Sequence, residues 1–481
     1  MVSRDRRITS VARSVRLVPT LRAASMFACA LVLGACGGGV HGTPGGSGVR
    51  DPYFPKAGND GYDVTHYGLR LAYDPGAEHL TGTATLTARA EKDLSAFNLD
   101  LVGMEVEQVT VGGEIARWNR AGQELTVRPR GDIDRDETFR VSVRYSGTPE
   151  TVTDPDGSRE GWLRTTDGVL ALGEPTGSMA WFPGNHHPSD KAAYDIAVTV
   201  PKGLRAVSNG ELRGERTARG RTTFVWHSGQ PMASYLATLA IGRFDISRSR
   251  AGELPLYTAV DPAEAAASRP VLARIPEVLR WSERRFGPYP FSATGAIVDS
   301  AALVGYALET QTRPVFPGAP DLPLLVHEFA HQWYGDSVTP ESWRDMWLNE
   351  GFATYAEWLW DEDHGGDSAQ ETFDAVYSGA HFDTEEAAKE IWEFPPADPP
   401  SAGQLSDPPV YWRGAMVLQK VRQVVGDDRF FAILRGWAAG HRHGNADTAD
   451  FTAYVEQQAP GKDLEAVWDE WLYGEGKPER P

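Results

Sequence analysis

The chain has 481 residues, of which 41% are hydrophobic and 23% are charged, and its formal net charge is −19. This length allows two or three domains with buried cores, and the composition is typical of a globular protein rather than a disordered one. A surface this acidic would repel phosphates, so no nucleic acid is expected among the partners.

Residues 1–36 resemble an export signal that should be excluded from the fold. Six arginines precede the apolar run Met26–Leu33, which is too short to span a bilayer because a spanning helix needs about 20 residues. The run ends in Leu-Gly-Ala-Cys, which resembles the lipobox of bacterial lipoproteins, where the peptide is cut before a cysteine that becomes lipidated. We expect export and a lipid anchor at Cys36 on the outer face of the cell membrane, with secretion through a general signal as the alternative.

The cysteine content and the next residues agree with an exported chain. Cys29 and Cys36 are the only cysteines, so the mature domains are expected to hold neither a disulfide nor a thiolate metal site. Residues 37–60 are rich in glycine and are predicted to form a flexible tether between the lipid and the folded body.

Strand-like patterns follow the tether. Hydrophobic residues alternate with other residues in the segments 67–73, 139–145 and 194–200, and turn residues separate such segments. A period of two is typical of antiparallel strands with one buried face, so an N-terminal β domain is predicted over residues 61–247.

Helical spacing replaces this pattern from about residue 260. Asp321 is placed to cap one predicted helix, with Pro323 in its opening turn, and the proline-rich residues 394–409 are predicted to be a loop. The expected architecture is α+β and multidomain, with a mostly α-helical domain over residues 248–475. The predicted helical segments are 261–287, 321–334, 344–363 and 414 almost to the end.

One of these helices carries the sequence His-Glu-Phe-Ala-His at residues 327–331. Positions i and i+4 lie on one helix face, so His327 and His331 point the same way and can both bind a zinc ion. Glu328 lies about 100° round the helix, where it could hold the water that zinc acidifies. Glu350 follows on the next predicted helix and can be a third ligand. Three protein ligands leave one coordination position open, which indicates catalysis rather than structure.

These residues resemble the gluzincin aminopeptidases of the M1 family, and the resemblance covers about residues 60–475. It includes "HEFAHQWYGDSVTP", then Glu350 in "LNEGFATY", and also "RFGPYPF" and "YDVTHYGLRLAYDP". The resemblance implies a thermolysin-like catalytic domain with one zinc ion. It also implies that N-terminal residues are removed from peptides by zinc-activated water, with Glu328 as the general base.

The resemblance further implies two carboxylates that bind the free α-amino group of a peptide. The family motif Gly-x-Met-Glu-Asn corresponds to residues 306–310, where Glu309 is kept and the flanking glycine, methionine and asparagine are replaced. Glu174, in "ALGEP", lies at the place of the second carboxylate. Leu172 replaces the family's glutamine, which affects the pocket for the first side chain.

The resemblance also gives roles to residues near the end of the chain. "YWRGAM" at residues 411–416 is similar to the family pattern Tyr-x-Lys/Arg-Gly, which implies that Tyr411 donates a hydrogen bond to the oxyanion of the tetrahedral intermediate. Arg413 is expected to orient structure rather than substrate. The neighbouring histidines His186-His187 and the pair His441 and His443 are interpreted as surface residues and not as a second metal site.

Three functions remain open from the sequence alone: a zinc aminopeptidase, an endopeptidase or epoxide hydrolase on the same scaffold, and a non-catalytic peptide-binding lipoprotein. Glu309 and Glu174 favour the first because they would bind an N-terminal ammonium. Intact Glu328 and Tyr411 argue against a lipoprotein that only binds peptides. The sequence ends before the long helical C-terminal domain of larger family members. We therefore expect a more open site with weaker selection by peptide length, or a cap that a partner supplies.

Overall fold

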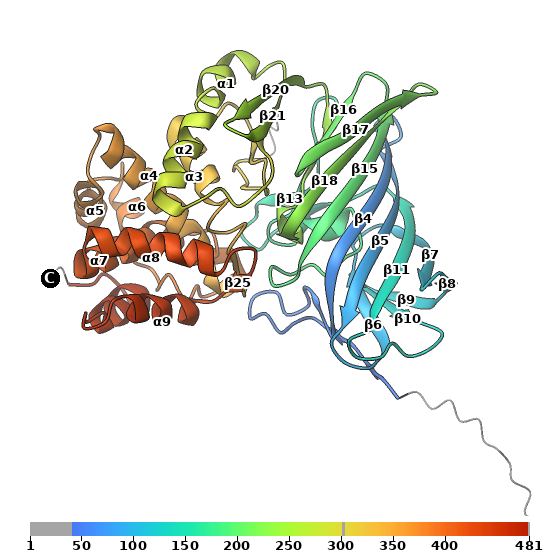
Figure 1. Cartoon of the computed structure of the whole chain (residues 1–481), viewed down its shortest axis with the longest axis horizontal. Coiled ribbons are helices and arrows are strands. Elements are labelled where there is room, and N and C mark those ends of the chain that lie inside the picture. The colour runs from blue at the N-terminus through green and yellow to red at the C-terminus, as the bar shows by residue number, and fades with distance from the viewer. Residues whose placement is uncertain (1–40, 301–303, 480–481) are drawn as a thin grey trace, which may run out of the picture. The chain divides into compact units, whose positions relative to one another are not determined.

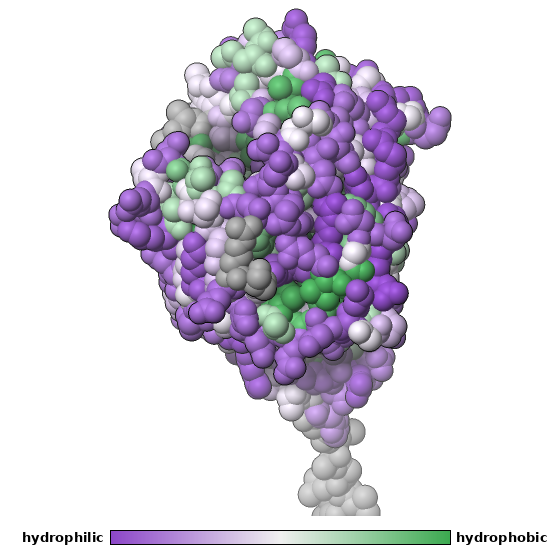
Figure 2. Space-filling model, turned by 90° about the vertical axis from the view of Figure 1, so that its left-hand side faces the viewer, coloured by the Kyte–Doolittle hydropathy of each residue, from purple (hydrophilic) through white to green (hydrophobic). Residues whose placement is uncertain are grey.

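The structure is a computed structural model, and it describes residues 41–300 and 304–479. Figure 1 shows long twisted strands in the earlier part of the chain and a group of helices in the later part, which confirms the predicted β domain followed by a helical domain. The predicted signal and Cys36 lie outside the described residues. Within those residues, no helix has the length and apolar character that crossing a membrane requires. The face in Figure 2 is mostly hydrophilic, in agreement with the net charge of −19.

The β domain is built on one sheet of eight strands in the order β17–β18–β15–β4–β5–β11–β7–β8. Neighbouring strands are antiparallel except β4 and β15, which are parallel, so the predicted antiparallel sheet has one parallel pair. The strands are β4 (Tyr62–Asp74), β5 (His79–Ala90), β7 (Glu105–Val111), β8 (Glu114–Ile115), β11 (Thr138–Gly147), β15 (Lys191–Pro201), β17 (Glu211–Ala218) and β18 (Arg221–Ala233).

The alternation predicted from the sequence is confirmed in this sheet. On β4, Tyr67, Leu69 and Leu71 are buried and at most 3% exposed. Residues 139–145 of β11 and 194–200 of β15 show the same alternation. One face of these strands therefore packs into the core, and apolar burial of this kind stabilises the domain.

Three smaller sheets complete this half of the chain, with the strand orders β1–β6–β10–β9, β12–β13–β14–β19–β16 and β2–β3. Their strands are β1 (Thr43–Pro44), β2 (Gly46–Ser47), β3 (Asn59–Asp60), β6 (Leu94–Asp100), β9 (Arg117–Ala121), β10 (Glu124–Arg128), β12 (Thr151–Thr153), β13 (Arg159–Arg164), β14 (Val169–Leu172), β16 (Arg205–Ser208) and β19 (Leu239–Gly242).

The helical domain contains a further sheet, β20–β21–β22–β23, and the strand pair β24–β25. The predicted boundary at residue 247 falls inside β20, which pairs with β21. The elements are β20 (Asp245–Ala251), β21 (Leu254–Val260), α1 (Ala265–Leu272), α2 (Ile275–Phe286), β22 (Thr294–Val298), β23 (Val315–Phe316), α3 (Leu322–Ala330), β24 (Thr339–Pro340), α4 (Trp347–His364), α5 (Ala369–Ser378), α6 (Glu385–Glu390), α7 (Gly414–Val425), α8 (Asp427–Gly440), β25 (Asn445–Ala446) and α9 (Thr448–Gln458).

The predicted tether over residues 37–60 is wrong from residue 41 onward. β1 pairs with β6 and β2 pairs with β3, so this stretch is bonded to the folded body. The N–H of His41 also donates to Asp132 over a distance of 2.6 Å. Composition did not reveal this because the partners lie far away along the chain.

Asp51 fastens the same segment to both domains. Its buried carboxylate accepts hydrogen bonds from the hydroxyl of Ser342 (2.9 Å), the N–H of Trp343 (3.0 Å) and two N–H groups of its own segment. The ring of His187 in the β domain lies 3.3 Å from the same carboxylate. Burial alone would raise the pKa of Asp51, but the hydrogen bonds from His187 and the backbone outweigh burial and lower it to about 2.

The interpretation of His186 and His187 as surface residues is also wrong. They are 3% and 4% exposed. The His186 ring contacts the carbonyl of Phe182, and the His187 ring contacts Ser189 and Asp51. Neither belongs to a cluster of metal-binding side chains in the part of the chain that the structure describes. Their role is to hold the fold together.

Replacing Asp51 by asparagine is expected to lower the free energy of unfolding by about 2 kcal/mol at pH 7, because a pKa lowered by nearly two units corresponds to roughly that energy. The folded pKa lies below the ordinary value of 3.8. The stabilisation is therefore complete above about pH 4 and is lost as the pH falls towards 2.

Urea unfolding of wild type and D51N from pH 7 to pH 2 measures this difference. The exposed change D383N is the control and should have little effect at any pH. The expectation fails if the gap between wild type and D51N is as large at pH 2 as at pH 7.

Candidate active site

The His-Glu-x-x-His motif lies on α3 and the residue that follows it. Asp321 caps this helix as predicted, because its carboxylate accepts a hydrogen bond of 2.9 Å from the N–H of Leu324. The helix ends at Ala330, earlier than predicted, but His331 keeps helical backbone angles (φ −55°, ψ −26°). His327 and His331 therefore still lie on one face, and both line the same cavity.

A close helix crossing brings Glu350 and Tyr411 to this cavity. α4 and α7 meet at Gly351 and Gly414, where a Cβ atom on Gly414 would lie 3.0 Å from the Cα of Gly351. A larger residue at either position would force the helices apart. Glu350 directly precedes the first glycine and Tyr411 lies three residues before the second, so the crossing sets both side chains in the cavity wall.

The three predicted ligands converge on one point. Nε2 of His327 lies 3.2 Å from Oε2 of Glu350, and Nε2 of His331 lies 3.5 Å from the same oxygen. A tetrahedral zinc ion with bonds of about 2.0–2.1 Å holds its ligand atoms about 3.3–3.4 Å apart. The spacing of the three side chains therefore fits zinc.

The outer nitrogens of both histidines are also engaged, which fixes the direction of the rings. Nδ1 of His327 lies 2.6 Å from Oε1 of Glu357, and Nδ1 of His331 lies 2.5 Å from Oδ1 of Asn349. Zinc-binding histidines usually donate their second N–H to such a partner, which leaves the other nitrogen free for the metal.

Sequence reasoning missed Glu357 and Asn349. Glu357 lies seven residues after Glu350, two turns along the same helix face, so helical spacing could have indicated it. Asn349 gave no comparable signal, because its contact with His331 depends on how α3 and α4 pack.

Glu328 lies in the cavity wall beside the ligands and is 4% exposed. Its Oε2 atom is buried and has no hydrogen-bond partner among the described residues. Burial raises the pKa of Glu328 to about 8, although the two imidazoles act in the opposite direction. A carboxyl group placed in this way can hold a water molecule and exchange a proton with it.

Glu309 and Glu174 lie together beside the ligand set. Each offers an oxygen within 4.8 Å of the other and of an oxygen of Glu350. Oε1 of Glu309 accepts a hydrogen bond of 3.0 Å from Nδ2 of Asn349, while Oε1 of Glu174 is buried without a partner in the described part of the chain. Burial raises the pKa of Glu174 well above its usual range, and Glu309 and Glu350 add to the effect. A cation bound here would relieve that cost.

Tyr411 lies in the π-helix Pro409–Arg413, and its ring is nearly parallel to that of His327, with centroids 6.2 Å apart. Burial raises the pKa of Tyr411 well above its usual range, and nearby carboxylates raise it further, so the phenol keeps its proton. Arg413 is buried and donates to backbone carbonyls such as that of Trp471 (2.9 Å). It supports structure, as predicted.

The cavity has a volume of about 820 Å³ and is lined by residues of both domains. The β-domain turn 154–159 touches the loop 402–406, since a Cβ atom on Gly403 would lie 3.2 Å from the carbonyl oxygen of Pro155. The hydroxyl of Tyr306 donates to the carbonyl of Arg159 over 3.0 Å. These contacts form one wall of the site.

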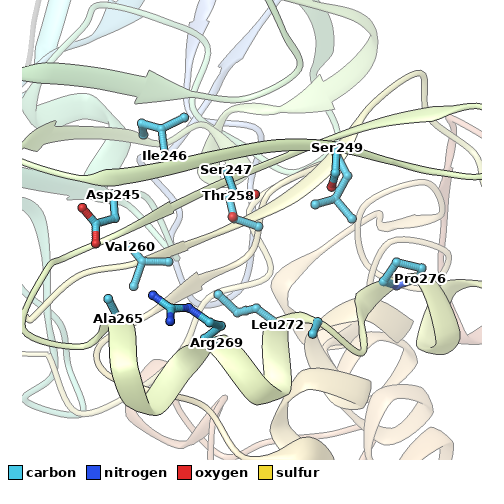
Figure 3. A pocket seen from close by; sticks show the side chains of 12 residues that line it. Asp245, Ile246, Ser247, Ser249, Thr258, Val260, Ala265, Arg269, Leu272 and Pro276 are labelled. Atoms are coloured by element: carbon cyan, nitrogen blue, oxygen red, sulfur yellow. The ribbon is translucent and has the colours of Figure 1, made fainter.

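A second hollow, of about 410 Å³, lies between α1 and the strands β20 and β21. Figure 3 shows the side chain of Arg269 directed from α1 towards these strands, with Asp245 at one end. None of the predicted site residues lines it. The candidate chemistry is therefore confined to the larger cavity.

The fold and the ligand set define the class as a zinc metallopeptidase, and known proteins agree. The family model for the "Peptidase family M1 domain" matches residues 322–471, and that for the "Peptidase M1 N-terminal domain" matches residues 63–236. The chain belongs to peptidase family M1. Family membership and the ligand set together identify the metal as one zinc ion.

Individual relatives are similar over most of this chain. The crystal structure of an M1 zinc metallopeptidase from Deinococcus radiodurans has a TM-score of 0.82 and 30% identity, covering 90% of this chain and 98% of that one. Tricorn protease-interacting factor F2 of Thermoplasma acidophilum is 26% identical over 86% of this chain and 54% of its own length. Glutamyl aminopeptidase of Bos taurus is 27% identical over 74% and 41%. The chain thus spans about half the length of these curated relatives.

Replacing His331 by alanine should reduce bound zinc from about one ion per chain to nearly none, because two remaining ligands hold zinc weakly. Metal analysis of the purified protein after dialysis measures the content. The half-buried His443, outside the cavity, gives the matched control H443A, which should keep its zinc. Stoichiometric zinc in H331A would contradict the ligand assignment.

Proposed function

We propose that this protein is a zinc aminopeptidase that removes N-terminal residues from peptides. The observation that carries the proposal is the carboxylate pair Glu174 and Glu309, which lies within 4.8 Å of an oxygen of the ligand Glu350. An N-terminal ammonium bound by this pair would put the first peptide bond next to the metal. Such a contact between a buried carboxylate and an ammonium is a charge-assisted hydrogen bond, among the stronger kinds in proteins.

Relatives support the same activity. Six of the similar curated proteins carry aminopeptidase names, among them glutamyl aminopeptidase and the probable aminopeptidase 2 of Sulfurisphaera tokodaii. A mutant of the Deinococcus metallopeptidase is described as bound to a Tyr-Ser-Ala substrate, which is a short peptide. The similarity to that structure extends over nearly the whole of its chain.

The positions of the side chains support a mechanism for this proposed activity. His327, His331 and Glu350 would hold the zinc ion, which would supply Lewis acidity and make a bound water molecule easier to deprotonate. Glu328 accepts a proton from the attacking water and then passes it to the leaving amine. Tyr411, protonated because its pKa is raised, donates a hydrogen bond to the oxyanion that develops on the scissile carbonyl.

The test of the proposal is a panel of aminoacyl chromogenic substrates with matched N-acetylated controls. Free-amine substrates should be cleaved at least about tenfold faster than acetylated ones, since a hydrogen bond to a charged group contributes about 1.5–3 kcal/mol. E309Q should raise the KM of free-amine substrates. Comparable cleavage of both sets would indicate an endopeptidase. Binding without any cleavage by zinc-loaded protein would indicate a peptide-binding protein.

E328Q should lose about 10²–10⁴-fold in kcat, because the variant cannot take the proton of the water. Its zinc content and unfolding midpoint should stay close to those of wild type, since Glu328 is not a ligand. Turnover at near the wild-type rate would remove Glu328 from the role of general base.

Y411F should lower kcat by about 10²–10³-fold with a small change in KM, because an oxyanion donor acts mainly in the transition state. Steady-state kinetics on one free-amine substrate gives both constants. If KM rose while kcat stayed constant, Tyr411 would contribute to substrate binding instead.

A further inference from the structure

Asn349 lies between the metal ligands and the carboxylate that is proposed to bind the substrate's ammonium. It is 0% exposed. Its Oδ1 lies 2.5 Å from Nδ1 of His331, and its Nδ2 donates to Oε1 of Glu309 over 3.0 Å. One side-chain amide therefore joins the two halves of the site.

The chemistry of the two neighbours demands one orientation of this amide. His331 can offer Nε2 to a metal only if its hydrogen is on Nδ1, and that N–H needs an acceptor. The Glu309 carboxylate can only accept, so it needs a donor. The oxygen of Asn349 must face His331 and its NH₂ must face Glu309, and this is the arrangement observed.

The surroundings are shaped to hold this arrangement. Gly335 has φ +122°, and a Cβ atom there would lie 2.0 Å from Oδ1 of Asn349, so the amide fits only beside glycine. Gln332 holds the backbone of the Glu309 loop, because its Nε2 donates to the Glu309 carbonyl (3.1 Å) and its Oε1 accepts from the N–H of Thr312 (2.7 Å). Gly335 and Gln332, which both follow α3, thus constrain the Asn349 amide and the Glu309 loop.

We propose that Asn349 is a positioning residue that couples ammonium recognition at Glu309 to metal retention through His331. The inference rests on the proposed function, in which Glu309 binds the amino terminus. A coupling of this kind is reciprocal: a change at the carboxylate alters metal binding, and a change at the metal alters recognition of the amine. The carbonyl of Tyr334, 3.2 Å from the same Nδ1, is a second acceptor, so loss of Asn349 should weaken the site by a limited factor.

The test compares E309Q with E309A by the rate at which bound zinc passes to a coloured chelator. Glutamine keeps an acceptor oxygen for Nδ2 of Asn349, whereas alanine leaves that donor buried without a partner and frees the amide to rotate. Zinc loss should be within about threefold of wild type in E309Q and about tenfold faster in E309A. N349A should also lose zinc about tenfold faster.

Double variants distinguish a link through Asn349 from general damage. E309A/N349A should lose zinc no faster than N349A alone, because the first change acts through the second residue. The matched control is E357A, which weakens the partner of the other histidine. In the double variant E309A/E357A, the rate of zinc loss should rise by the product of the factors found for E309A and E357A alone.

Equal zinc loss in E309A and E309Q, or multiplying effects of E309A and N349A, would overturn the coupling. If the parent protein still prefers free-amine substrates in that case, the proposed function stands and only this inference fails. If the parent protein holds no zinc or cleaves acetylated substrates equally well, the proposed function fails as well.

Discussion

The site depends on the way α3 and α4 present three metal-binding atoms to one point. A histidine on a helix can turn either nitrogen inwards, so the two rings need outside partners to select Nε2. Glu357 and Asn349 provide them from α4, the helix that also carries Glu350. The helix with the third ligand thus also aligns the other two. The geometry of the metal site therefore depends on how α3 and α4 pack against each other.

The crossing of α4 with α7 extends that dependence to the rest of the chemistry. The backbone contact between Gly351 and Gly414 leaves no room for a side chain. Glu350 and Tyr411, which precede these glycines by one and three residues, reach the cavity. Burial and the neighbouring carboxylates raise the pKa of Glu174, whereas the imidazoles of His331 and His327 lower the pKa of Glu350 to about 2 despite its burial. The charge of these carboxylates is costly in a buried place, and a divalent ion together with a substrate ammonium would offset it.

The sequence predicted those parts of the site that depend on local geometry. Spacing on one helix predicted that His327, Glu328 and His331 lie together, and the next predicted helix offered Glu350 as a further ligand. Tyr411 required the resemblance to the M1 family, because no spacing or period in the sequence connects it to the zinc helix. Asn349 was not predicted, because its role depends on its contact with His331, which comes from a different helical segment. Packing of this kind is decided by side chains that are distant in the sequence, and a single sequence does not record which of them meet.

Residues 41–60 were also mispredicted because their partners are distant in the sequence, and their contacts decide where a force on the chain would act. Their composition is that of a linker, yet Asp51 binds them to Trp343, four residues before the start of α4. Tension applied to the chain ahead of residue 41 would first meet the Asp132 contact at His41, then the strand pairs β1–β6 and β2–β3, and only then the Asp51 contacts. The contact of Asp51 with Trp343 lies four residues before α4, which carries Glu350. A force applied from the N-terminal side would therefore act on the catalytic domain as well as on the β-sheet that follows in the sequence.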